Sequence, residues 1–167
     1  MVFPDDLVRR AEGLISTARA KRMRVATAES CTGGLVSALL TEIPGSSDVV
    51  ECCFVTYSNQ AKTRLLGVSS KLIASHGAVS PEVARAMAEG ALEHSAADLA
   101  VSITGVAGPG GGSAEKPVGL VELACAARGR GTILATERFA DLGRSQIRLA
   151  AVGKALWLFE RFLAEAP

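Results

Sequence analysis

Aromatic residues, histidine and net charge are all scarce in this sequence. Aromatic side chains make up 4% of the 167 residues, so a platform for stacking nucleic-acid bases is poorly supplied. Lys and Arg number 18 against 17 Asp and Glu, and the resulting net charge of +1 argues against binding a polyanion by bulk charge. We therefore expect no nucleic-acid partner, while a local phosphate site stays compatible with the composition.

The sequence also lacks the patterns of a metal site or a membrane segment. Its four cysteines form no C-x-x-C pair, and its two histidines, His76 and His94, lie far apart and are expected to be structural. No run approaches the roughly 18 apolar residues of a membrane span, and the N-terminus lacks the basic and apolar regions of a signal peptide. We expect a cytoplasmic protein with no metal, no cofactor and no membrane partner.

Apolar side chains are abundant, at 49% of the chain against 21% charged residues. This balance excludes intrinsic disorder, and the length fits one domain over residues 1–167. Hydrophobic periodicity predicts helices over 5–22, 32–42, 60–66, 70–75, 81–95 and 143–164, and strands over 24–28, 49–57, 98–103, 118–127 and 132–139. The alternation predicts an α/β fold: a single layered domain with a mixed, mostly parallel β-sheet flanked by helices, a C-terminal hairpin and a long terminal helix. Because that helix offers a surface to a second subunit, we expect a homo-oligomer.

The first candidate site is the segment Thr27-Ala28-Glu29-Ser30-Cys31-Thr32-Gly33-Gly34, where a strand ends and a helix begins. Ser30 lies at the turn, beside free backbone N–H groups and the positive end of the helix dipole, so a nucleophile there would have oxyanion donors next to it. Alternatively, Ser30 or Thr32 only caps the helix. Cys31 is a second candidate nucleophile, because a helix N-terminus lowers the pKa of a thiol.

The second candidate site is the polar cluster Tyr57-Ser58-Asn59-Gln60-Ala61-Lys62, which follows a strand and contains the only tyrosine of the chain. A buried lysine can lose its proton and act as a base, or it can tune a tyrosine that does. Tyr57 and Lys62 are therefore candidate proton-transfer groups. The alternative is a solvated lysine beside a surface tyrosine.

The third candidate site is a glycine-rich loop over residues 104–117, which follows a strand predicted to be buried. Its glycines allow backbone N–H groups to approach an anion closely. The spacing matches neither G-x-x-x-x-G-K-[ST] nor G-x-G-x-x-G, so neither a P-loop nor a Rossmann fingerprint is supported. Arg144 and Arg148 lie one turn apart on the last helix, where they either share an anion or are solvated.

Taken together, these segments are far more specific than each is alone. The motifs at residues 27–34, 57–62, 76–80, 104–111 and 115–119 occur in this order. From about residue 7 to residue 163, the chain closely resembles the C-terminal domain of the CinA (competence/damage-inducible) family, which is also called the nicotinamide-nucleotide amidase family.

The resemblance implies metal-free hydrolysis of the carboxamide of nicotinamide mononucleotide, giving nicotinate mononucleotide and ammonia in pyridine-nucleotide salvage. Ser30 would be the nucleophile, and Lys62 and Tyr57 would activate it and relay its proton to the leaving ammonia. The glycine loop would bind the small-molecule nucleotide at its phosphate or ribose, and the residues expected there are Thr104, Gly105, Gly108, Gly110, Gly111 and Arg144. From geometry rather than from the resemblance, we expect the backbone N–H groups of Thr32, Gly33 and Gly34 to hold the oxyanion.

Two other functions are compatible with the same residues. A non-catalytic nucleotide-binding or regulatory module would keep the glycine loop without needing Ser30, Tyr57 and Lys62. An amidase of the same mechanism could act on another small carboxamide, because nothing in the motifs names the pyridine ring.

Overall fold

The computed structural model describes residues 3–140 and 142–166, so four residues of the predicted domain 1–167 lie outside the described part. Five strands form one sheet in the order β2-β1-β3-β4-β5. They are β1 (Val25–Glu29), β2 (Val50–Val55), β3 (Leu99–Gly105), β4 (Leu120–Ala127) and β5 (Gly131–Arg138). β1 pairs in parallel with β2 and with β3, whereas β4 runs antiparallel to both β3 and β5. The predicted mixed sheet and the C-terminal hairpin are therefore confirmed.

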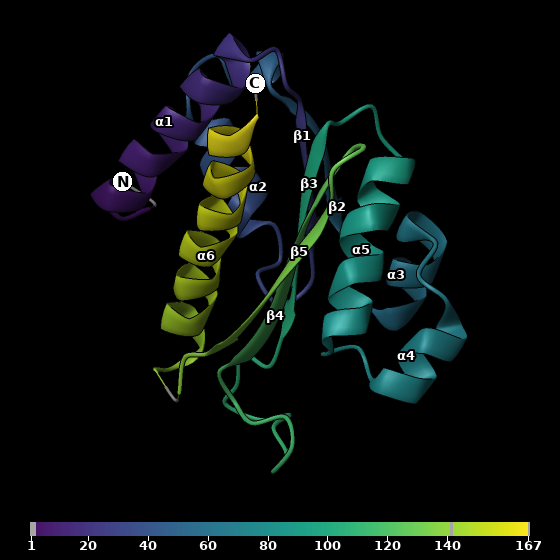
Figure 1. The fold of residues 1–167 in the computed structure, drawn as a ribbon. Coiled ribbons are helices and arrows are strands. Elements are labelled where there is room, and N and C mark those ends of the chain that lie inside the picture. Colours follow the sequence, from purple (N-terminus) through teal and green to yellow (C-terminus); the bar gives the residue numbers. More distant parts are fainter. Residues whose placement is uncertain (1–2, 141, 167) are drawn as a thin grey trace.

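Helices cover both faces of the sheet (Figure 1). One layer holds α1 (Asp5–Ala20), α2 (Leu35–Glu42) and the long α6 (Arg144–Glu165), and the other holds α3 (Asn59–Leu66), α4 (Ser70–His76) and α5 (Pro81–Glu93). A short 3-10 turn, Ser46–Asp48, leads from α2 into β2. No helix within 3–140 and 142–166 combines the length and apolar character needed to cross a membrane. The predicted α/β layering is confirmed.

The two faces of the sheet bury different side chains, because successive strand residues point to opposite sides. On β3, Leu99, Val101 and Ile103 pack into the core beneath α1, α2 and α6, whereas Ala100 packs beneath α5. The α5 face of the sheet is lined largely with alanines, which allows close helix packing. A Cβ added at Gly90 of α5 would lie 2.0 Å from the carbonyl oxygen of Leu66, the last residue of α3. This close packing fixes α3 against the layer.

The neighbouring parallel strands β1 and β2 are followed by helices on opposite faces of the sheet. After β1 the chain passes to α2 in one layer, and after β2 it passes to α3 in the other. In open sheets with parallel strands, such a reversal leaves a crevice outside the carboxyl ends of the strands, where ligands bind. Ser30 directly follows β1, and Tyr57 lies two residues beyond β2. The topology thus brings the first two candidate sites to one place.

Candidate active site

Ser30 and Lys62 meet in the crevice at the end of β1. The Ser30 amide donates to the carbonyl of Ile103 on β3, which fixes the backbone of the serine beside the sheet. The Nζ of Lys62 lies 3.0 Å from Ser30 Oγ and 2.9 Å from the carbonyl oxygen of Thr56, and it donates to both. Only 1% of Lys62 is exposed. The structure therefore buries the lysine that the sequence left as either buried or solvated.

Lys62 is buried without an acidic partner. No carboxylate within residues 3–140 and 142–166 lies within ion-pair distance of its ammonium group. Burial disfavours the charged form of a lysine and lowers the pKa of Lys62 below its ordinary 10.5. A lysine in this state is available as an unprotonated amine at a lower pH than a surface lysine, which is what a general base requires.

Cys31, the alternative nucleophile, lies beside Ser30 but in a setting that keeps its thiol protonated. Burial raises the pKa of Cys31 to about 11, and the nearby Glu29 carboxylate adds to the effect. The thiolate, and not the thiol, is the reactive form of cysteine. The pKa therefore favours Ser30 over Cys31 as the nucleophile.

Glu29 is a residue of the site that the sequence patterns did not indicate. Its side chain is fully buried, and its carboxylate accepts hydrogen bonds from the amides of Gly34, Val36 and Ser37 and from the Ser37 hydroxyl. Helix α2 begins at Leu35, with Gly34 as its N-cap and no capping by its own side chain. The carboxylate of Glu29 thus fills the N-terminal end of α2, where the sequence predicted free N–H groups. A carboxylate so close to a helix start could have been suspected, but no periodicity signals its burial.

This arrangement changes which amides can serve an oxyanion. The Gly34 amide donates to Glu29, and the Gly33 amide donates to the carbonyl of Ser30 at 3.0 Å, so both predicted donors are engaged. Thr32 is fully buried, with a hydroxyl that has no partner among the described residues. The backbone amides of Cys31 and Thr32 likewise donate to no backbone carbonyl within 3–140 and 142–166. They are the donors left free next to Ser30.

Glu29→Gln is expected to destabilise the protein by about 3 kcal/mol, because the amide replaces a buried charge and turns an NH2 group toward backbone N–H donors. Urea unfolding followed by circular dichroism would measure the change. Glu42→Gln is the matched control: Glu42 is exposed at the last position of the same helix, where a negative charge faces the negative end of the dipole. Equal stability of the two variants would show that the carboxylate of Glu29 does not hold this turn.

A cavity of about 220 Å³ opens above the Ser30–Lys62 pair. The cavity is lined by the ends of β1, β2 and β3, by the start of α3 and by the segment before α5. Its lining residues are Ser30, Cys31, Tyr57, Asn59, Lys62, Ala78, Val79, Thr104, Gly105, Ala107 and Arg144. All three predicted catalytic residues and three of the predicted substrate-binding residues, Thr104, Gly105 and Arg144, therefore border one space.

Tyr57 lies at the mouth of the cavity and is 61% exposed. Its hydroxyl accepts a hydrogen bond from Arg144 at 3.0 Å, and no bond joins it to Ser30 or Lys62 among the described residues. The second arm of the Arg144 guanidinium donates to the carbonyl of Gly108 at 2.7 Å. Arg144 therefore ties the tyrosine to the glycine loop, while Arg148 contacts a different part of the chain.

The predicted residues of the glycine loop divide into two groups. The Thr104 hydroxyl donates to the carbonyl of Ala78 across the cavity wall. A Cβ at Gly105 would lie 2.8 Å from the carbonyl oxygen of Leu120, so β4 requires a glycine there whether or not a ligand binds. Gly110 and Gly111 are exposed, have no atom within 4 Å of an added Cβ, and lie outside the cavity lining. The structure brings the start of the loop to the site and leaves these two glycines away from it.

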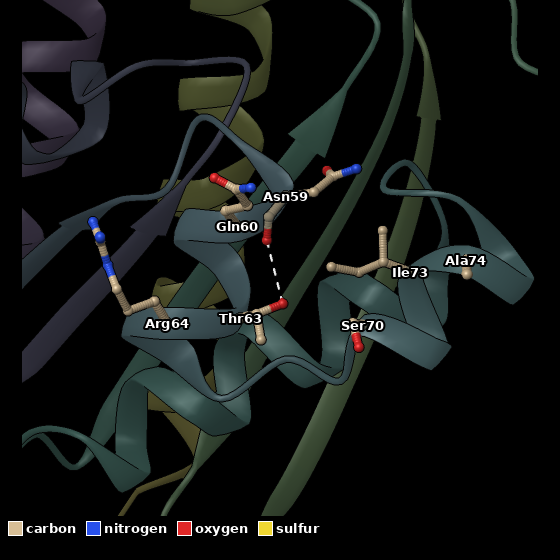
Figure 2. Close-up of a pocket in the computed structure, with 7 residues that line it drawn as sticks. All are labelled: Asn59, Gln60, Thr63, Arg64, Ser70, Ile73 and Ala74. Carbon is tan, nitrogen blue, oxygen red and sulfur yellow. Dashed lines mark hydrogen bonds between the residues drawn. The ribbon is translucent and has the colours of Figure 1, made fainter.

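A wider groove of about 510 Å³ lies between α3 and α4 and shares Asn59 with the cavity. Figure 2 shows Thr63 donating to the backbone carbonyl of Asn59, while the Arg64 side chain points away from α4. The lining contains no candidate nucleophile with a base beside it. Reactive groups therefore converge in the smaller cavity.

Neither histidine lies in the cavity. His76 faces Glu82 at 3.5 Å, and His94 lies against the carbonyl of Gly90. Over the described ranges 3–140 and 142–166, no group of three or more His, Cys, Asp or Glu side chains is placed to hold a metal ion. The chemistry available at the site is that of a hydroxyl, a buried amine, two unpaired amides and the Arg144–Tyr57 pair.

Known proteins are similar to this chain in sequence and in fold. The family model described as the CinA C-terminal domain matches residues 8–163. A CinA-like protein of Mycolicibacterium paratuberculosis is 50% identical over 160 residues, which are 94% of this chain and 37% of that protein. A CinA-like protein of Syntrophobacter fumaroxidans is 50% identical over 147 residues, which are 88% of this chain and 34% of that protein. The chain spans 25–37% of the length of the curated relatives it matches.

Solved structures agree over nearly the whole chain. The competence/damage inducible protein CihA from Agrobacterium tumefaciens superposes with a TM-score of 0.95 at 50% identity, covering 96% of this chain and 98% of that one. A CinA superfamily protein from Escherichia coli gives a TM-score of 0.89 at 32% identity, covering 97% of this chain and 94% of that one. The chain therefore belongs to the CinA C-terminal domain family.

Proposed function

We propose that this domain hydrolyses the carboxamide of nicotinamide mononucleotide to nicotinate mononucleotide and ammonia, as a step of pyridine-nucleotide salvage. The observation that carries the proposal is the 3.0 Å contact between Ser30 Oγ and the Nζ of a buried lysine with no acidic partner among the described residues. A hydroxyl is a weak nucleophile until a neighbouring base takes its proton, and this contact supplies such a base. A nucleotide-binding module would have no need of it.

The reaction begins with Lys62 as the free amine. The amine accepts the Ser30 proton with its lone pair, while one of its N–H groups keeps its hydrogen bond to the carbonyl of Thr56. Ser30 Oγ then attacks the carboxamide carbon, and the resulting tetrahedral intermediate collapses as Lys62 returns the proton to the leaving nitrogen. Ammonia departs and an acyl ester remains on Ser30. Water gives a proton to the same lysine as it attacks the ester, and Lys62 then returns this proton to Ser30 Oγ as the C–O bond breaks. The acid product leaves as the carboxylate, with its proton lost to solvent.

The free amides of Cys31 and Thr32 are the proposed donors to the oxyanion. The amide of the residue after a serine nucleophile serves this purpose in other hydrolase sites, and Cys31 holds that position here. Donors of this kind stabilise charge that appears only in the intermediate and in the transition states around it. This assignment replaces Gly33 and Gly34, whose amides are already engaged within the turn.

Tyr57 and Arg144 are proposed to bind the substrate at the mouth of the cavity. A space of about 220 Å³ is small beside the 300–1,000 Å³ typical of ligand pockets. The proposed binding mode places the ring that bears the carboxamide inside this cavity, and the ribose and phosphate extend outward past Tyr57. Arg144 belongs to the cavity lining and also contacts the glycine loop at the carbonyl of Gly108, so its guanidinium is the proposed cation for the phosphate.

Ammonia release tests the proposal directly. The purified domain, incubated with nicotinamide mononucleotide and a chelator, is expected to give ammonia and nicotinate mononucleotide in equal amounts. Nicotinamide riboside and free nicotinamide serve as matched substrates that lack the phosphate or the whole nucleotide portion. Turnover of these two at the same kcat/KM would point to an amidase of another small carboxamide, and no ammonia from any of them would leave a non-catalytic module.

A further inference from the structure

Arg148 contacts the turn that follows Ser30 and no acidic group within 3–140 and 142–166. Its Nε donates to the carbonyl of Cys31 at 3.1 Å, and one of its terminal nitrogens donates to the carbonyl of Thr32 at 2.9 Å. Arg144, one turn earlier on α6, is occupied with Tyr57 and Gly108. The two arginines therefore contact different parts of the chain, and Arg148 is the group of α6 that holds the Ser30 turn.

The contact with Cys31 fixes the direction of one free amide. In a planar trans peptide the C=O and the following N–H point to opposite sides. Because the carbonyl of Cys31 points to Arg148, the amide of Thr32 points away from it. That amide is one of the two without a partner near Ser30. The guanidinium also polarises this peptide, which strengthens the N–H as a donor.

The contact between Arg148 and the Thr32 carbonyl fixes the direction of the Cys31 amide indirectly, through the hydrogen bond between Gly33 and Ser30. With the carbonyl of Thr32 on Arg148, the Gly33 amide points to the opposite side, where it donates to the carbonyl of Ser30 at 3.0 Å. The Ser30 carbonyl is thereby held, and the Cys31 amide in the same peptide must point away from it. One guanidinium thus sets the orientation of three consecutive peptide groups after the nucleophile.

We propose that Arg148 is a positioning residue of the oxyanion site: it holds the peptides after Ser30 so that the amides of Cys31 and Thr32 face the developing negative charge. The proposal rests on the hydrolytic function proposed above. It makes Arg148 act through the backbone, without touching the substrate. Its removal should therefore slow the chemical step and leave substrate binding nearly intact.

The test compares Arg148→Met with Arg148→Lys and with Arg161→Met. Arg161 lies on the same helix, where it contacts Trp157 and Glu165 and no residue of the cavity. Arg148→Met is expected to lower kcat by about 10²–10³-fold, the effect of losing one oxyanion donor, with KM changed by less than about threefold. Arg148→Lys keeps the positive charge but cannot contact both carbonyls with a planar guanidinium, so its kcat should lie between those of Arg148→Met and the wild type. The kcat of Arg161→Met should match that of the wild type. Added guanidinium ion should restore part of the rate of Arg148→Met.

Two results would overturn the positioning role. One is a wild-type kcat in Arg148→Met. The other is a raised KM at unchanged kcat, which would make Arg148 a substrate-binding group. If Arg148→Met does not fold, Arg148→Lys takes its place, and a wild-type kcat in that variant is equally decisive.

A fluorophosphonate separates this inference from the proposed function, because it needs no particular substrate. Ser30 Oγ displaces fluoride from phosphorus while Lys62 takes the proton, and the phosphoryl oxygen uses the same donors as an amide oxyanion. The labelling rate of Arg148→Met should fall in parallel with kcat. A wild-type protein that is neither labelled nor able to release ammonia would refute the hydrolase itself, whereas equal labelling of both proteins would refute only the role of Arg148.

Discussion

Ser30→Ala is expected to lower the rate of ammonia release from nicotinamide mononucleotide by at least about 10⁴-fold, because no other hydroxyl of the cavity lies against a base. Loss of the nucleophile removes the acyl-enzyme route altogether, and the remaining amides can only assist attack by water. The alanine leaves the backbone bond from residue 30 to Ile103 in place, so the fold should persist. Ammonia release measures the rate, and calorimetric titration with the nucleotide measures the Kd, which should stay near the wild-type value.

Cys31→Ser is the matched control for this variant. The substitution lies at the next residue, keeps the amide that is proposed to bind the oxyanion, and removes a thiol whose pKa is raised to about 11. Because such a thiol stays protonated at neutral pH, the rate of Cys31→Ser should remain within about tenfold of the wild type. If instead Cys31→Ser is inactive and Ser30→Ala retains turnover, the nucleophile has been assigned to the wrong residue.

The order and type of the helices and strands could be predicted because their hydrophobic periodicity is strong. The apolar run that forms β3 and the helical spacing that forms α5 are signals of this kind, and both elements form where predicted, within two residues at either end. The start of α2 was predicted three residues too early, at residue 32. Periodicity does not show that a buried carboxylate from the preceding strand, Glu29, would cap that helix from outside.

The candidate site shows the same division between local and long-range information. The motif order brought Ser30 and Lys62 under consideration, but their 3.0 Å contact joins residues 32 positions apart and depends on how closely α3 packs on α5. The only signal for Arg148 in the sequence is its spacing from Arg144, and that spacing was compatible either with a shared anion or with two solvated arginines. Its carbonyl partners lie 116 and 117 residues away, in a turn whose geometry no sequence pattern describes.

Lys62→Met is expected to lower kcat by about 10²–10⁴-fold while leaving the protein at least as stable as the wild type at neutral pH. Methionine fills a similar volume and removes the cost of burying an amine whose charged form has no acidic partner among the described residues. Lys62→Arg should be inactive at every pH and less stable, since a guanidinium keeps its charge when buried and cannot act as a base. Lys71→Met, at an exposed position on α4, should change neither property.

The pH dependence gives Lys62 a signature that a merely structural lysine would lack. The unfolded chain keeps this proton up to the ordinary pKa of 10.5, whereas the folded protein releases it at a lower pH. Between these two values the unfolded state holds more of this proton than the folded state, so the contribution of Lys62 to the free energy of unfolding rises with pH, and its penalty is complete below the folded pKa. Burial raises the pKa of the Cys31 and Cys125 thiols, and their effect on stability has the opposite sign in the wild type and in both variants. Urea unfolding from neutral pH toward 10.5 should therefore show the wild type gaining stability relative to Lys62→Met as the pH rises, whereas the difference between the wild type and Lys71→Met should stay constant. Activity should rise through the same lowered pKa, because only the free amine can take the proton of Ser30; a wild-type rate independent of pH across that range would remove Lys62 from the role of base.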